Sequence, residues 1–179
     1  MKTTLLSLLL LFPLLPLLAQ SESPLLQGNM SSENMAFEQL RFKAYEVVTI
    51  WKKESTINEA DLQLRLDEAN QIINELTPQR HSFLTDDERL LKALRIKGES
   101  SLFLEHYQDA ISCLRQCLAL ESTPEKAAVH AKQLGIAYVA VGFPKRACQY
   151  FELSVDLMEG NEEGIDEKVR QLWHYCCGM

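Results

Sequence analysis

Cysteine is the residue type with the most distinctive chemistry in this sequence, because a thiol can stay free, form a disulfide or bind a metal. An odd number of cysteines in an oxidising compartment leaves at least one outside any intramolecular disulfide. All five lie in the second half of the chain: Cys113, Cys117, Cys148, Cys176 and Cys177.

The three uses of a thiol involve different cysteines. We expect Cys117 and Cys176 to act as small core residues, because both fall on apolar helix faces. A disulfide from Cys148 to Cys176 or Cys177 is the more specific alternative, since it would join a terminal helix to the helices before it. A metal site is the least favoured, because its spacing matches no known zinc pattern. Its members would be Cys113, Cys117, His174 and Cys177.

The remaining reactive side chains form no recognisable catalytic arrangement. The sequence has no Gly-rich phosphate loop, His-Glu-x-x-His pair, Gly-x-Ser-x-Gly elbow or Cys-x-x-Cys motif. The acidic residues are typical of solvated helix faces, and no carboxylate pair for acid–base catalysis can be singled out. The sequence therefore predicts a protein that is not an enzyme and has no cofactor or metal. The histidines are scattered at His81, His106, His130 and His174.

Length and charge limit the kinds of protein this can be. The 179 residues suffice for one ordinary domain. The net charge is −7 and the calculated pI is near 5.2. An acidic chain is unsuited to sequence-independent binding of nucleic acid or to docking on anionic lipid, because both depend on excess Lys and Arg. We therefore expect no nucleic-acid partner, and no membrane contact beyond the N-terminal segment.

Residues 1–20 are predicted to be a signal peptide. Lys2 precedes an almost unbroken leucine run from Leu5 to Leu18, which is shorter than the ~20 residues that a spanning helix needs. Cleavage is expected after Ala19 or Gln20, which places the protein in the periplasm or the medium. The alternative is an uncleaved anchor in the inner membrane. Residues 21–34 are rich in Ser, Glu and Asn, and we expect a flexible lead-in there.

Residues 35–179 are predicted to be helical throughout. Apolar residues recur at intervals of three and four, and no sustained alternation of strand type is present. Helix starts are indicated by the capping-box pair Thr85 and Glu88 and by Thr123 followed by Pro124. We expect helical hairpins at about 35–76, 86–120 and 124–159, and a last helix at about 162–176, with a start signal at Asn161.

The expected hairpins repeat one another. Ala131, Leu134, Gly135 and Tyr138, followed by Ala147 and Phe151, match an upstream series of Leu94, Lys97, Gly98 and Ser101, followed by Ala110 and Leu114. Ala110 and Ala147 are 37 residues apart, and a fainter copy begins at Ala69. Glycine and alanine at these positions would allow close approach between helices, and the bulky residues one turn later would fill the space between hairpins.

This pattern resembles the tetratricopeptide (TPR) repeat family. The resemblance implies an all-α fold: a right-handed superhelical stack of about three hairpins with a C-terminal capping helix. It also implies a protein-binding adaptor, scaffold or chaperone whose first helices line a groove for a protein or peptide. Projecting the groove positions of the family onto the two clear repeats gives Lys92, Arg95, Glu99, Leu102, Val129, Lys132, Gln133, Ile136 and Val139. Glu99 stands where a carboxylate-binding member would have asparagine, which argues against capture of a C-terminal carboxylate.

The sequence thus favours an exported TPR adaptor or scaffold of bacterial type, within an envelope or secretion-related assembly. One alternative is a cytosolic chaperone like the three-repeat helpers of type III secretion. A second is a thiol-dependent redox or metal-handling accessory protein, suggested by the adjacent pair Cys176 and Cys177. Packing of a terminal hairpin against another copy would make the protein a homo-oligomer.

Overall fold

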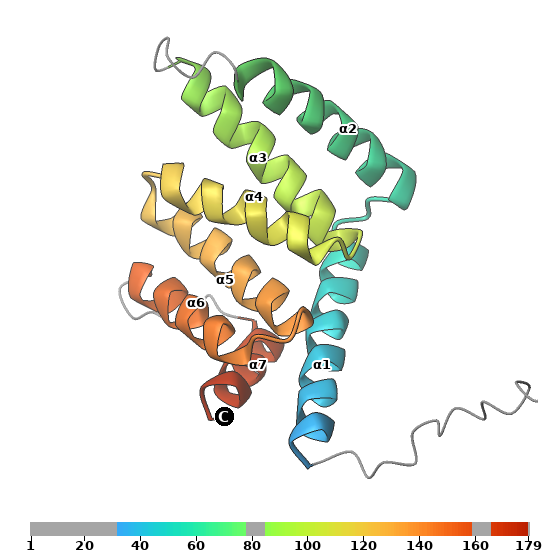
Figure 1. Cartoon of the computed structure of the whole chain (residues 1–179), viewed down its shortest axis with the longest axis vertical. Helices are drawn as coiled ribbons and strands as arrows, with labels where there is room; N and C mark the ends of the chain where they lie inside the picture. The colour runs from blue at the N-terminus through green and yellow to red at the C-terminus, as the bar shows by residue number, and fades with distance from the viewer. Residues whose placement is uncertain (1–31, 78–84, 159–165, 179) are drawn as a thin grey trace, which may run out of the picture. The chain divides into compact units, whose positions relative to one another are not determined.

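The protein is all-α over the residues that the computed structural model describes, 32–77, 85–158 and 166–178 (Figure 1). Ser32–Met179 forms one compact unit. None of the described helices is both long and apolar enough to span a membrane. The predicted leader, most of the predicted lead-in and the start signal at Asn161 lie outside the described residues. The helices are α1 (Ser32–Glu54), α2 (Glu59–Leu76), α3 (Thr85–Phe103), α4 (Tyr107–Leu120), α5 (Pro124–Ala140), α6 (Pro144–Leu157) and α7 (Glu167–Cys177).

Helices α3 to α6 form the two hairpins that the sequence indicates most clearly. α3 packs on α4, α4 on α5 and α5 on α6, and α7 follows on α6 (Figure 1). α5 starts as predicted, with Thr123 at the N-cap and Pro124 in the first turn, although the Thr123 side chain makes no capping hydrogen bond. α7 starts later than predicted, because Asp166 caps it by accepting a hydrogen bond from the Lys168 N–H.

The small residues of the repeat lie at helix contacts, which confirms their predicted role. Ala110 and Ala147 are fully buried. A Cβ atom added to Gly135 would lie 2.5 Å from the ring of Phe151, and one added to Gly98 would lie 3.0 Å from Leu114. Both glycines therefore allow the second helix of their hairpin to approach closely.

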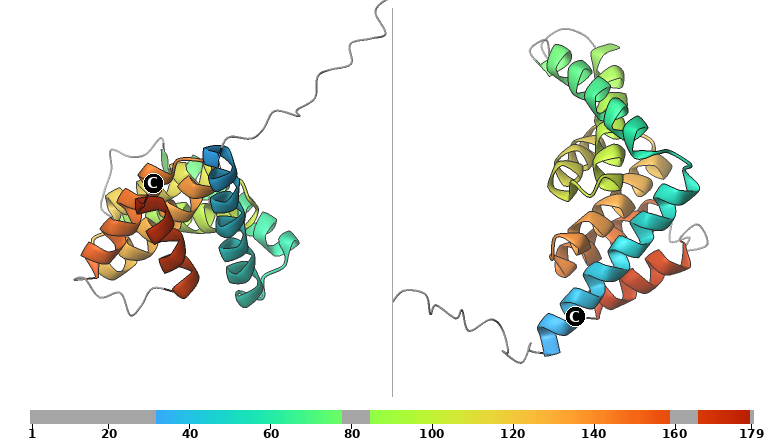
Figure 2. Two further views of the ribbon diagram at one scale, coloured as in Figure 1. Left: turned by 90° about the horizontal axis from the view of Figure 1, so that it is seen from below. Right: turned by 90° about the vertical axis from the view of Figure 1, so that its right-hand side faces the viewer.

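The prediction of a hairpin over residues 35–76 is wrong. α2 packs on α3, whereas α1 crosses to α3, α5 and α7 (Figures 1 and 2). In the right-hand view of Figure 2, α1 runs alongside α7. The reason is that Leu76 at the end of α2 packs in a small core with α3 and α4, while the stripe of Leu40, Ala44 and Val47 on α1 joins the main core.

Candidate functional site

The face that α3, α5 and α7 share is the candidate functional site, and α1 covers part of it. Leu40 and Val47 of α1 are buried in the same cluster as Leu102 of α3 and Ile136 and Val139 of α5. This cluster continues into α7 through its residues Val169, Leu172 and Cys176. The first helices of the hairpins thus hold an amphipathic helix, and that helix belongs to the same chain.

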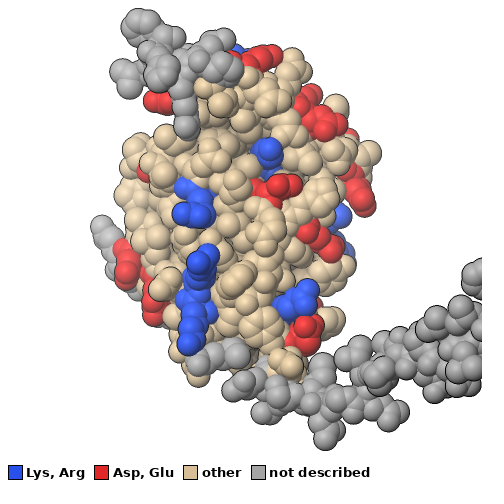
Figure 3. All heavy atoms as spheres, in the orientation of Figure 1, with Lys and Arg blue, Asp and Glu red and all other residues tan. Residues whose placement is uncertain are grey.

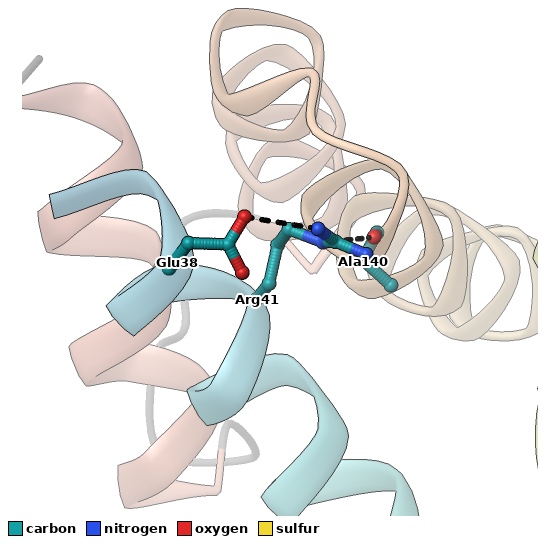
Figure 4. A network of polar contacts seen from close by, with 3 residues as sticks. All are labelled: Glu38, Arg41 and Ala140. Carbon is teal, nitrogen blue, oxygen red and sulfur yellow. Dashed lines mark hydrogen bonds and ion pairs between the residues drawn. The ribbon is translucent and has the colours of Figure 1, made fainter. Parts of the chain in front are cut away.

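A hydrogen bond attaches α1 to the end of α5. Arg41 donates from Nε to the carbonyl oxygen of Ala140 over 3.1 Å, and its Nη1 lies 3.0 Å from Oε1 of Glu38 (Figure 4). The last carbonyls of a helix have no partner within it and carry its negative dipole end, so a guanidinium group is well suited to that position.

Two cation–π contacts accompany this hydrogen bond. The Nζ of Lys132 on α5 lies 5.4 Å from the centre of the Trp51 ring on α1. The Nζ of Lys43 on α1 lies 5.0 Å from the centre of the Tyr175 ring on α7. Burial lowers the pKa of Lys132, and Asp166 opposes that shift. Each contact places a cation over an electron-rich ring face and so helps to hold α1 against α5 and α7.

The nine residues projected onto the groove divide into a covered group and an open group. Leu102, Ile136 and Val139 are buried in the cluster that α1 shares, so they are not free to meet a partner while α1 is in place, and Gln133 is buried as well. Lys132 is half-buried beside Trp51, and Glu99 is half-buried on α3. The open group consists of exposed Lys92, partly exposed Arg95 and Val129, which is 43% exposed.

A pocket of about 430 Å³ adjoins the open group. It lies between the first half of α3 and the turn from α4 to α5, and its basic side chains are Lys92, Arg95 and Lys126. Asp87, Glu88 and Glu121 line the same pocket, so its charge is mixed. On the face of the molecule in Figure 3, acidic and basic side chains are likewise interspersed on a mostly uncharged surface.

A buried polar group lies beside this pocket. His130 is 1% exposed, and its Nε2 lies 3.9 Å from Oε2 of Glu121. Neither ring nitrogen has a hydrogen-bond partner among the described residues. Burial lowers the pKa of His130, although the nearby Glu121 carboxylate opposes that shift, so the neutral imidazole is favoured. Burial raises the pKa of Glu99, and the nearby Arg95 opposes that rise.

The cysteines divide between one disulfide and three buried thiols. Cys148 on α6 is bonded to Cys177 on α7, which is one of the two pairings that the sequence left open. Cys117 and Cys176 are free core residues, as the sequence predicted. Burial raises the pKa of each to about 12, so neither is an available thiolate.

The metal site suggested by the sequence is not assembled. Cys113 and Cys117 lie in the small core between α2, α3 and α4, whereas Cys177 is in the disulfide on α6 and α7. Among the described residues, the group with metal-ligand proximity is Cys148, Glu152 and Cys177, within 4.8 Å of one another. The sulfur atoms of Cys148 and Cys177 are joined in the disulfide, so neither is a thiolate that could bind a metal.

Sequence reasoning missed the residues that hold α1. Arg41, Lys43 and Trp51 were not singled out, because each looks like an ordinary residue of an amphipathic helix. A signal was present in the spacing of Leu40, Ala44, Val47 and Trp51, which marks one apolar face. That spacing does not say which helices the face packs on.

Comparison of the chain with family models, curated proteins and solved structures finds no match.

Proposed function

We propose that this protein is an exported adaptor of the TPR type that binds a protein partner on the face of α3, α5 and α7. The observation that carries the proposal is that an amphipathic helix, α1, already lies on this face. A groove that holds a helix by an apolar stripe and a few polar contacts is a recurrent mode of peptide recognition. α1 leaves one end of the face open, so the partner would contact that end.

The open end defines the chemistry of the partner. Lys92, Arg95 and Lys126 surround the pocket, and Val129 adds an exposed apolar side chain. Acidic residues next to an apolar residue in the partner would complement these groups. The buried His130 and the half-buried Glu99 are better explained as groups that position α3 against α5 than as a catalytic centre.

The disulfide supports export rather than retention in the cytosol. Disulfides such as the Cys148–Cys177 bond persist in oxidising compartments and are rare in the cytosol. This favours the periplasm or the medium, or a periplasmic position of a chain anchored by residues 1–20, over a cytosolic secretion chaperone. The burial of the three free thiols disfavours a thiol-dependent accessory protein.

The proposal is tested by site-specific photo-crosslinking in the native cell. A crosslinker at Val129 is expected to capture a partner that a crosslinker at exposed Gln116 on α4 does not capture.

The purified partner is then titrated against the double variant Lys92→Glu, Lys126→Glu. We expect binding to weaken at least tenfold with an unchanged Tm. The matched control is Arg115→Glu with Lys145→Glu, two exposed residues on α4 and α6 outside that face. Equal loss of binding in both double variants, or none in either, would contradict the proposal. Lys132 is unsuitable for reversal, because its ammonium group lies over Trp51.

A further inference from the structure

A second pocket, of about 380 Å³, lies where α1 meets the turn between α3 and α4 and the end of α5. Three aromatic rings line it: Phe42 and Tyr45 from α1, and Tyr107 from the start of α4. The carboxylates of Glu38 and Glu105 line it as well. No residue of this pocket belongs to the groove positions projected from the sequence.

Two of the three aromatic residues of this pocket are unusually exposed. Phe42 is 63% exposed and Tyr45 is 45% exposed, although both lie on a helix that buries its opposite face. The four cation–π contacts among the described residues involve Tyr175, Trp51, Tyr138 and Phe143, and none involves the rings of this pocket. The exposed rings of Phe42 and Tyr45 are therefore available to a ligand, and the partly buried ring of Tyr107 lines the same pocket.

Glu105 is held in a backbone conformation that disfavours a side chain. Its φ is +65°, in the left-handed region, and the equivalent turn 37 residues later has Gly142 at φ +89°. The two turns share their hydrogen bonds: His106 N–H donates to Ser101 O over 2.8 Å, and Phe143 N–H donates to Tyr138 O over 2.8 Å. Glycine is the residue that such a helix end favours, so this turn carries a carboxylate at a conformational cost.

The exposed Glu105 carboxylate does not pair with the basic side chain of the pocket. Arg41, the one basic residue that lines the pocket, is bound to Glu38 and to the Ala140 carbonyl (Figure 4). No ion pair or hydrogen bond of the Glu105 carboxylate is found among the described residues. Burial raises the pKa of Tyr107 to about 12, with a further contribution from Glu105, so its ring stays neutral.

We propose that this pocket binds a primary alkylammonium group, the lysine side chain of a protein partner, with Glu105 as counter-ion and the rings of Phe42, Tyr45 and Tyr107 as its walls. Aromatic faces attract cations, and a carboxylate accepts the N–H groups of a primary ammonium ion. A quaternary ammonium ion lacks those N–H groups and would lose the hydrogen bonds to Glu105. The inference does not depend on the adaptor proposal, because amine binding is measured without any partner.

The test is an NMR titration of the full, oxidised chain with n-butylammonium as the probe. We expect saturable shifts of the backbone amides around Glu105 and Tyr45. Binding of tetramethylammonium should be at least fivefold weaker. The tripeptide Gly-Lys-Gly should bind at least as tightly as n-butylammonium if the ligand is a lysine side chain. An absence of saturable binding, equal affinity for the quaternary ion, or weaker binding of the tripeptide would overturn the assignment.

The decisive variant is Glu105→Gly, which replaces the strained residue by the one found at the equivalent turn. It should weaken amine binding at least tenfold and at the same time raise the Tm, because glycine relieves the positive φ. Phe42→Ala should also weaken binding, whereas Leu64→Ala, which removes a similarly exposed side chain from α2, should not. Unchanged amine affinity in Glu105→Gly would show that the carboxylate is not the counter-ion.

Discussion

Arg41 of α1 donates a hydrogen bond of 3.1 Å to the carbonyl oxygen of Ala140, 99 residues later, at the end of α5. The sequence predicted that this helix belongs to a first hairpin over residues 35–76. The contact instead attaches it to the end of α5. Since the carbonyl is one of the last of α5, it has no partner within its own helix. The guanidinium group therefore caps α5 and holds α1 on the face of α3, α5 and α7.

Removing the Arg41 guanidinium should destabilise the fold modestly. Arg41→Met keeps an unbranched apolar stem but loses the hydrogen bond, and we expect the free energy of unfolding to fall by about 1 kcal/mol. Glu38→Gln removes only an exposed ion pair within α1 and should cost about 0.3 kcal/mol. Urea unfolding of the two variants measures the difference. Equal costs would mean that the bond to Ala140 contributes nothing.

The two mid-helix glycines should respond differently to alanine. In Gly135→Ala the new methyl group would lie 2.5 Å from the buried Phe151 ring, so we expect a loss of about 1–3 kcal/mol. In Gly98→Ala the nearest atoms are Cγ and Cδ2 of the buried Leu114 at 3.0 Å, a looser contact than that with Phe151. The gain in helix propensity of about 1 kcal/mol should offset that contact. Thermal unfolding compares the variants, and a Tm that falls as far in Gly98→Ala as in Gly135→Ala would contradict this account.

The Cys148–Cys177 disulfide should contribute a large share of the stability of α7. It closes a loop with a sequence separation of 29. The chain-entropy model assigns roughly 3–4 kcal/mol to a loop of that length. The double variant Cys148→Ser, Cys177→Ser and the reduced wild-type protein should therefore show the same lowered Tm. The control is Cys176→Ala, which removes a buried free thiol. The Tm of this variant should still fall when the disulfide is reduced. A Tm unaffected by reduction would exclude a stabilising role for the bond.

His130 should make stability depend on pH below neutrality. Burial holds its pKa below the ordinary 6.5, so between that lowered pKa and 6.5 the unfolded chain binds a proton that the folded chain does not. Stability therefore falls as the pH drops from 6.5, by at most about 1.4 kcal/mol per pH unit. His130→Gln should flatten this dependence in urea titrations between pH 7 and pH 5.5.

Glu99 is the necessary control for that measurement. Burial raises its pKa above 4.5, so between 4.5 and that raised pKa the folded state binds a proton that the unfolded chain does not, and stability rises as the pH falls through that window. The sign is opposite to that of His130. Glu99→Gln should therefore make the decline on acidification steeper. A His130→Gln variant with the wild-type pH dependence would assign the decline to other groups.

The local pattern of the sequence was enough to predict the hairpins of α3 to α6. Their helix limits follow from apolar spacing and from Pro124, and their close packing follows from Gly98 and Gly135 placed one helix away from Leu114 and Phe151. The thiols of Cys117 and Cys176 were predictable as core residues for the same reason. These features depend on neighbours within one hairpin or on one helix face.

Only the tertiary structure decided where α1 lies and which cysteine Cys148 meets. An apolar stripe on a helix shows that this face is buried but not which surface buries it. The sequence was therefore compatible with a hairpin of α1 and α2, whereas α1 packs on α3, α5 and α7. On α7, Val169, Leu172 and Cys176 fill the core, and this rotation turns Cys177 toward Cys148. The sequence by itself determined the helices and their apolar faces, because those depend on short-range periodicity. The partner of each face was settled by competition among all the surfaces of the folded chain, which no local pattern records.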